Sequence, residues 1–179
     1  AHEGVARDME YAKKNCLIDQ IVYLSLTSTI KVGVTRSTQK PTRWIDQGAV
    51  QAIELARTPN RYLAGQIEVF LKGHLKDKTY WRAMLKNERD TTKDLLEMKA
   101  EAADLLPSEY LEFLSSDDAI TEIHYPVEIY PQKVSSLNFE ITPLIKGVLA
   151  GIKGQYLIFE SEAVLNIRKF GGYKVKVSY

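Results

Sequence analysis

The residues best suited to chemistry lie in one short stretch of the chain. Residues 21–44 read IVYLSLTSTIKVGVTRSTQKPTRW and carry four cations, which are Lys31, Arg36, Lys40 and Arg43. In a chain whose formal net charge is only +1, this local excess predicts a surface that faces phosphate, with plain solubility as the alternative. The guanidinium fork of Arg43 suits a pair of phosphate oxygens better than an ammonium group does, although an exposed salt bridge would also account for it.

Gly33 and Tyr23 belong to the same stretch. A glycine inside an apolar strand marks the close approach of a backbone or a ligand, or else simple packing. If the chain turns back near residue 28, Tyr23 lies across from Gly33, with its hydroxyl either in a cleft or half-buried in packing. The candidates for substrate contact on this segment are Gly33, Thr35, Arg36 and Lys40.

Glu68 is the most interesting acid, because it sits in an apolar helical pattern between Ile67 and Val69. Its carboxylate is expected at the edge of the core rather than in open water. A partly desolvated carboxylate requires a cation. A hard metal such as Mg²⁺ is one candidate, and a salt bridge to an arginine is the alternative.

Other kinds of site find little support in the sequence. The three histidines show no metal-ligand spacing, and no phosphate loop or dinucleotide fingerprint is present. The single cysteine, Cys16, rules out an internal disulfide within these residues and fits a reducing compartment. No apolar run reaches the roughly 18 residues that cross a bilayer, and no signal pattern opens the sequence, so we expect a cytoplasmic protein.

The elements that must position these residues come first in the chain. Residues 20–28 and 27–36 are rich in β-formers and predict an antiparallel hairpin. Pro41 and Gly48 bound a short helix over 40–48, and 50–58 predict a third strand. A clearer helix is predicted over 61–75, where apolar residues recur at the spacing of one buried face, with Thr58 or Asn60 as its N-cap.

The remainder divides into a helical and a β-rich part. Helices are predicted over 77–85, 88–105 and 107–115, and strands over 122–130, 147–159, 163–170 and 173–179. We therefore expect a first domain at 17–87, an acidic helical section at 88–120 and a small β module at 121–179. The charge follows this division, because 88–122 carry eleven acids against three bases whereas 17–62 and 123–179 are each net positive by three. The acidic part is expected to be solvated helix surface.

Two resemblances to known families accompany these patterns. The run I-V-Y, then K-V-G-V-T, then R-W on a helix and a glutamate in the next long helix resembles the GIY-YIG endonuclease superfamily, over roughly residues 20–87. The strings KVGVTR, PTRWIDQGA, DKTYWRAML and GIKGQYLIF are similar to an uncharacterised bacterial family, the domain-of-unknown-function family 2797, along nearly the whole chain. The implied fold class is α+β, with a small GIY-YIG-like three-stranded antiparallel sheet flanked by helices, then a helical section and a C-terminal all-β module.

The nuclease resemblance also implies roles. Glu68 would hold Mg²⁺ or Mn²⁺, Tyr23 would help to activate the attacking water, and Arg43 would balance charge on the phosphorane. The sequence departs from the pattern where Lys31 replaces the tyrosine of the second triplet, because a protonated lysine cannot take a proton. Lys31 can still hold a phosphate, so it stays among the candidate catalytic residues, and similar lysine variants occur in related branches of the superfamily.

Three functions therefore remain open from the sequence. The first is a nucleic-acid-processing protein that acts as a one-metal phosphodiester hydrolase. The second is a non-catalytic nucleic-acid-binding module on the same scaffold. The third is a protein-interaction module whose acidic helices meet a basic partner. The first two make nucleic acid the expected partner, and both depend on Tyr23, Arg43 and Glu68 meeting in space.

Overall fold

The first sheet forms the centre of the amino-terminal part of the molecule. The computed structural model describes residues 1–75, 80–92 and 94–179. The sheet is antiparallel with the order β2-β1-β3-β4. Its strands are β1 (Gln20–Leu26), β2 (Ile30–Arg36), β3 (Gln51–Thr58) and β4 (Thr121–Glu122). The predicted hairpin is confirmed, and Tyr23 pairs with Gly33 across it.

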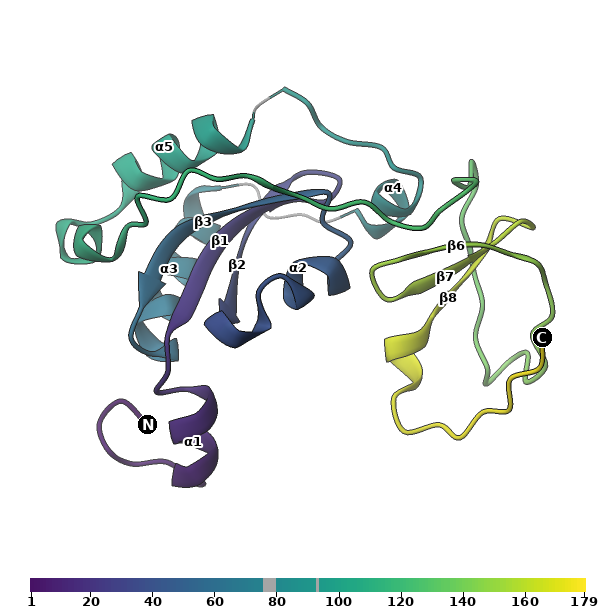
Figure 1. Cartoon of the computed structure of the whole chain (residues 1–179), viewed down its shortest axis with the longest axis horizontal. Helices are drawn as coiled ribbons and strands as arrows, with labels where there is room; N and C mark the ends of the chain where they lie inside the picture. The colour runs from purple at the N-terminus through teal and green to yellow at the C-terminus, as the bar shows by residue number, and fades with distance from the viewer. Residues whose placement is uncertain (76–79, 93) are drawn as a thin grey trace.

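Helices cover both faces of this sheet, as Figure 1 shows. The helices and 3-10 turns that come before residue 125 in the chain are α1 (Met9–Asn15), η1 (Ser37–Gln39), α2 (Thr42–Asp46), α3 (Arg61–His74), α4 (Trp81–Leu85), α5 (Leu95–Leu105) and η2 (Ser108–Phe113). The Asn60 side chain caps α3 by accepting from the backbone N–H of Leu63 at 3.0 Å. None of the helices in the described part of the chain combines the length and apolar character that a bilayer crossing requires.

The alternation of β1 sorts the core into two layers. Val22 and Leu24 point to one face, where they pack with Ile67 and Leu71 of α3 and with apolar residues of α5. Ile21 and Tyr23 point to the other face, where they pack with Trp44 of α2, Ala49 and Ala52. The short helix α2 is therefore held to the sheet by one large side chain, because Trp44 has no exposed surface.

Residues 125–179 form the carboxy-terminal module, which is built on a second sheet. Its strands are β5 (Ser135–Ser136), β6 (Leu149–Lys153), β7 (Tyr156–Phe159) and β8 (Ala163–Asn166), in the order β5-β8-β7-β6. A 3-10 turn, η3 (Ile167–Phe170), follows β8. Met84 and Leu85 of α4 pack with Ala150, Ile158 and Val164, so α4 belongs to the core of this module.

Several predicted elements differ from the structure. The first sheet has four strands rather than three, because Thr121 and Glu122 pair with Ala52 and Gln51. The rest of the predicted strand 122–130 is irregular, since Pro126 has no N–H to donate to a ladder. The predicted strand 173–179 is wrong, because this segment forms no ladder with a neighbouring strand.

The helical predictions need smaller corrections. The helix predicted over 88–105 begins only at Leu95, because Asp94 and Glu97 form a capping box there. The region 107–115 contains a 3-10 turn after Pro107 rather than an α-helix. The helix predicted over 77–85 is α4, although residues 77–79 lie outside the described residues.

The carboxy-terminal module is fastened to the end of α2. The Tyr125 hydroxyl lies 3.1 Å from the carbonyl oxygen of Ile45 and 2.8 Å from that of Ala49. A side chain on Gly154 would meet the backbone of Asp46 and Gly48 at 3.0 to 3.2 Å, so the β6–β7 turn packs directly on α2. The module therefore holds a fixed place relative to the helix that carries Arg43.

Lys153 anchors this junction. Its side chain has no exposed surface, and its Nζ donates to Asn87 Oδ1 at 3.0 Å. The ammonium group also lies 5.5 Å from the ring centroid of Tyr125 and 5.2 Å from that of Tyr130. Burial, with the charge of Arg89 as a smaller cause, lowers the pKa of Lys153 from 10.5 to about 8. At neutral pH the folded protein thus keeps a charged amine in a desolvated place.

Replacing Lys153 by methionine is expected to change how stability depends on pH. Between pH 8 and pH 10.5 the unfolded chain keeps this proton while the folded chain has lost it, so the wild-type free energy of unfolding gains from Lys153 as the pH rises. Lys153→Met has no such gain. Relative to wild type, its free energy of unfolding should therefore fall by about 1 to 3 kcal/mol between pH 7 and pH 10 in urea titrations. If the free energies of unfolding of the two proteins differed by the same amount at pH 7 and pH 10, the lowered pKa of Lys153 would be contradicted.

Candidate functional site

A register shift in the first sheet brings the charged side chains together. The partner of Val22 on β3 is Ala56, but the partner of Tyr23 is Glu54, so β3 has one extra residue at this point. In a regular strand, residues three apart point to opposite faces. Here Glu54 and Arg57 lie opposite Tyr23 and Ile21, which places both on the face that α2 covers.

Tyr23 lies at the centre of that face. Its ring fills the space above Gly33, where an added Cβ would be 2.7 Å from both Cζ and the hydroxyl oxygen of Tyr23. The ring also packs edge-on against Trp44, with 5.7 Å between centroids. Tyr23 has no exposed surface. Gly33 is thus a glycine because a tyrosine ring needs the space, which is the packing alternative that the sequence left open.

Arg43 and Gln47 of the α2 segment surround the hydroxyl group of Tyr23. In the amide orientation that satisfies both neighbours, Gln47 donates to the Tyr23 oxygen at 2.9 Å and accepts from Nε and Nη2 of Arg43 at 3.3 Å each. Arg43 and Gln47 are four residues apart and therefore lie on one side of the helical turn. Since Arg43 is half-buried, part of its guanidinium group remains accessible.

The pKa of Tyr23 depends on the charges around its hydroxyl group. Burial raises the pKa of Tyr23 to about 12, the charge and hydrogen bond of Arg43 lower it, and the charge of Glu68 raises it. A guanidinium group from the α2 segment and a carboxylate from α3 thus both act on one phenol. Arg43 thus contacts the Tyr23 hydroxyl group, whereas Glu68 acts on it through its charge alone. At neutral pH the phenol is protonated, so it can orient neighbours by hydrogen bonding but cannot serve as a base.

Glu68 is partly accessible, as the sequence predicted. Its side chain is 22% exposed and pairs with Lys72, one helical turn further on, at 3.1 Å from Nζ to Oε1. The cation at this carboxylate is thus a lysine rather than the arginine that the sequence offered as the alternative to a metal. Such a helical pair contributes only about 0.3 to 0.5 kcal/mol, so a divalent cation can displace it.

A metal at Glu68 would have to complete its coordination from outside the protein. No group of three or more His, Cys, Asp or Glu side chains is placed to hold a metal in residues 1–75, 80–92 and 94–179. Mg²⁺ in phosphoryl-transfer sites is nevertheless held by one or two carboxylates together with substrate phosphates and water. Glu68 fits this second kind of site and does not fit a cage made of protein ligands alone.

Glu54 is a buried acid whose role sequence reasoning missed. It is 4% exposed, and it accepts hydrogen bonds from Lys40 Nζ and, at 2.9 Å, from Arg57 Nη2. Lys40 also lies over the Trp44 ring, 5.1 Å from its centroid. Lys40 is therefore committed to holding α2 against the sheet, and its predicted contact with substrate would have to break this pair. The one signal in the sequence was an acid inside an apolar strand.

The other predicted residues are distributed over both faces of β2. Lys31 lies opposite Ser25, on the same face as Gly33. Thr35 shares that face but is 5% exposed, which leaves little of it for a substrate. Arg36 points to the opposite face and donates to Asn15 Oδ1. The structure thus leaves Arg36 away from the Tyr23 cluster, and the binding roles of the other residues stay predictions.

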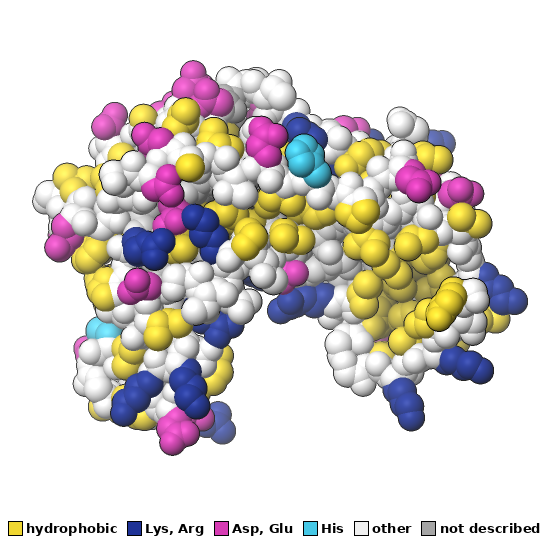
Figure 2. Space-filling model, viewed as in Figure 1, with side chains coloured by type: hydrophobic (Ala, Val, Ile, Leu, Met, Phe, Trp, Pro, Cys, Tyr) yellow, Lys and Arg dark blue, Asp and Glu magenta, His cyan; other side chains and the backbone are white. Residues whose placement is uncertain are grey.

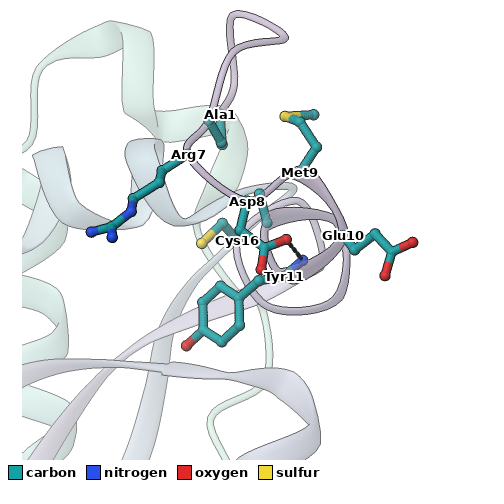
Figure 3. Close-up of a pocket in the computed structure, with 9 residues that line it drawn as sticks. Ala1, Arg7, Asp8, Met9, Glu10, Tyr11 and Cys16 are labelled. Atoms are coloured by element: carbon teal, nitrogen blue, oxygen red, sulfur yellow. Dashed lines mark hydrogen bonds between the residues drawn. The ribbon is translucent and has the colours of Figure 1, made fainter.

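Two hollows in the described surface lie elsewhere. One is open and rests against α1, where Figure 3 shows Arg7 and Glu10 pointing away from each other and Asp8 accepting from the N–H of Tyr11 at 2.9 Å. Its polar groups do not converge on a ligand position. The other is lined by Thr29, Ile30, His74, Leu75, Asp90, Thr92, Met98 and Glu101. Neither contains Tyr23, Arg43 or Glu68.

Comparison with known proteins places the chain in a family but assigns no activity. A family model described as "Protein of unknown function (DUF2797)" matches residues 1–175. No curated protein and no solved structure matches the chain. Any functional conclusion must therefore come from the site itself.

Exchange of Gly33 for alanine is expected to displace Tyr23. Because the added Cβ would overlap the Tyr23 ring, Gly33→Ala should lower the free energy of unfolding by about 1 to 3 kcal/mol in urea titrations. Gly65 in α3 provides the matched control, because a Cβ there meets nothing within 4 Å. Gly65→Ala should raise the free energy of unfolding by up to about 1 kcal/mol. Equal effects of the two substitutions would show that Tyr23 does not occupy this place.

Proposed function

The chain belongs to the DUF2797 family, and from the geometry of its first sheet we propose that it is a nucleic-acid-processing protein that binds a phosphodiester beside Tyr23. The observation that carries the proposal is that Arg43 and Glu68, which are distant in sequence, both act electrostatically on the Tyr23 hydroxyl group. A cation and an anion that act on the same hydroxyl group suit a phosphate and the metal ion that accompanies it. The resemblance to the GIY-YIG core supports the same conclusion.

Arg43 is the proposed phosphate ligand. Gln47 and Tyr23 take up some of its N–H groups and fix the plane of the guanidinium group. The remaining donors can reach two oxygens of one phosphate, which a lysine could not do with the same geometry. Tyr23 is thus proposed as a positioning residue, since its buried and protonated hydroxyl group orients Arg43 rather than activating water.

Glu68 is the proposed metal ligand. When bound, Mg²⁺ or Mn²⁺ would polarise a phosphoryl oxygen and stabilise the charge on the leaving group. Glu68 would exchange its ion pair with Lys72 for the metal, and the weakness of that pair makes the exchange inexpensive. With the metal, the activity proposed is hydrolysis of a phosphodiester bond.

The second candidate is binding without cutting, and one observation favours it. Tyr23 has no exposed surface, and its raised pKa leaves it protonated, while Lys31 stands where the resemblance places a second tyrosine. Neither residue supplies a general base near the proposed phosphate. On this account Arg43 and Glu68 hold nucleic acid, and the water-activating group of the nuclease pattern has been lost.

Substitution of Glu68 distinguishes the two candidates. If the protein is a hydrolase, wild type should cut plasmid, single-stranded DNA or RNA in Mg²⁺ or Mn²⁺, and Glu68→Gln should slow cutting by about 100-fold or more. Glu112→Gln removes an exposed carboxylate outside the site and should leave the rate unchanged. The readout is the initial rate of cleavage on gels.

The hydrolase and the binding module predict different results. No metal-dependent cleavage by wild type, together with nucleic-acid binding that Arg43→Ala weakens, would overturn the hydrolase and leave the binding module. Binding that is absent, or that Arg43→Ala leaves unchanged, would overturn both candidates.

A further inference from the structure

The carboxy-terminal segment carries a positive charge that acidic side chains neutralise only in part. Residues 163–179 hold four cations and no acid, namely Arg168, Lys169, Lys174 and Lys176. All four side chains are exposed. In the part of the chain that the structure describes, only Arg168 of these four forms an ion pair, with Asp46 at 3.6 Å. Lys169 Nζ lies 5.6 Å from the ring centroid of its neighbour Phe170, and the ammonium groups of Lys174 and Lys176 are available to an external anion.

This segment begins beside the proposed site. The Arg168–Asp46 pair joins η3 to the last residue of α2, the helix that carries Arg43. Figure 1 shows η3 as the short helix after β8, on the side of the module that faces α2. In Figure 2 the molecule is hollowed between α1 and the carboxy-terminal module, and Lys and Arg side chains lie around this hollow.

The place where this segment leaves the module is fixed relative to α2. Tyr125 and Gly154 of the module contact the backbone at the end of α2, and Lys153 is buried in the same junction. A ligand that contacts both Arg43 and the start of this segment gains from such rigidity, because these two places need not be brought together when it binds. Two acidic side chains of the described residues contact this segment, because Asp46 pairs with Arg168 and Glu140 accepts from the Tyr173 hydroxyl at 3.0 Å.

We propose that residues 167–176 form a second phosphate-contacting surface, so that the ligand is a polynucleotide strand that extends from Arg43 past Arg168 to Lys174 and Lys176. Figure 1 shows that the chain after η3 follows the edge of the module away from α2, so only a long strand reaches these two lysines. This inference rests on the proposed function and extends it from a single phosphodiester to a strand. A mononucleotide or dinucleotide would reach only the first region. Affinity should therefore depend on the length of the ligand, and the dependence should come from the carboxy-terminal lysines.

The test uses the full chain with two single-stranded probes, a dinucleotide and a long oligonucleotide. Lys174→Gln/Lys176→Gln should weaken binding of the long probe by about tenfold or more at low salt. It should also reduce the slope of log affinity against log salt concentration by about 1.4, since each lost single-strand phosphate contact accounts for about 0.7. Binding of the dinucleotide should stay unchanged. Lys133→Gln/Lys146→Gln, which removes the same charge from exposed positions of the same module, should leave both probes unaffected.

The contradicting results are distinct from a failure of the proposed function. The second surface would be overturned if both double variants lost the same affinity for the long probe, or if Lys174→Gln/Lys176→Gln lost none. In either case Arg43→Ala would still weaken binding of both probes. A different contradicting result is that Lys174→Gln/Lys176→Gln loses binding to vesicles of anionic phospholipid while it binds the long oligonucleotide as wild type does. That result would overturn the second nucleic-acid surface in favour of a membrane contact. Wild-type protein that binds neither probe would overturn the proposed function itself.

Discussion

A buried phenol imposes the constraint on which the site depends. Tyr23 has no exposed surface, so its hydroxyl group must find its hydrogen-bond partners inside the protein. Arg43 and Gln47 supply them, and the absence of a side chain at Gly33 leaves room for the ring. One satisfied hydroxyl group thereby sets the place of a guanidinium group that would otherwise move freely on a five-residue helix.

The same helix is held by charge and packing on its other sides. Lys40, just before α2, donates to the buried carboxylate of Glu54. Trp44 of α2 is fully buried against the sheet. At the far end, the carbonyl groups of Ile45 and Ala49 accept from Tyr125. A helix this short is not stable alone, so these contacts determine its position. The carboxy-terminal module thus contributes to the site by fixing α2, even though its own sheet lies outside it.

Local patterns predicted the elements of the first sheet but not the details of how its strands pair. The hairpin, β3 and α3 followed from β-formers, turn residues and the spacing of apolar positions, and the Tyr23–Gly33 pairing followed from the place of the turn. The extra residue of β3 opposite Val22 and Tyr23 depends on pairing between strands, and no local pattern encodes it. The buried Lys153 reads in sequence as an ordinary exposed lysine, and the segment 173–179 has β-formers but no neighbouring strand.

The central claim is that the charges of Arg43 and Glu68 both act on the Tyr23 hydroxyl group, and the pKa of that group tests it most directly. The Cζ signal of labelled Tyr23 can be followed by NMR through an alkaline titration of wild type, Glu68→Gln and Arg43→Ala. We expect a wild-type pKa near 12, a lower pKa in Glu68→Gln and a higher one in Arg43→Ala, because the two charges act in opposite directions. A pKa that neither substitution moves would show that the three side chains do not share a site.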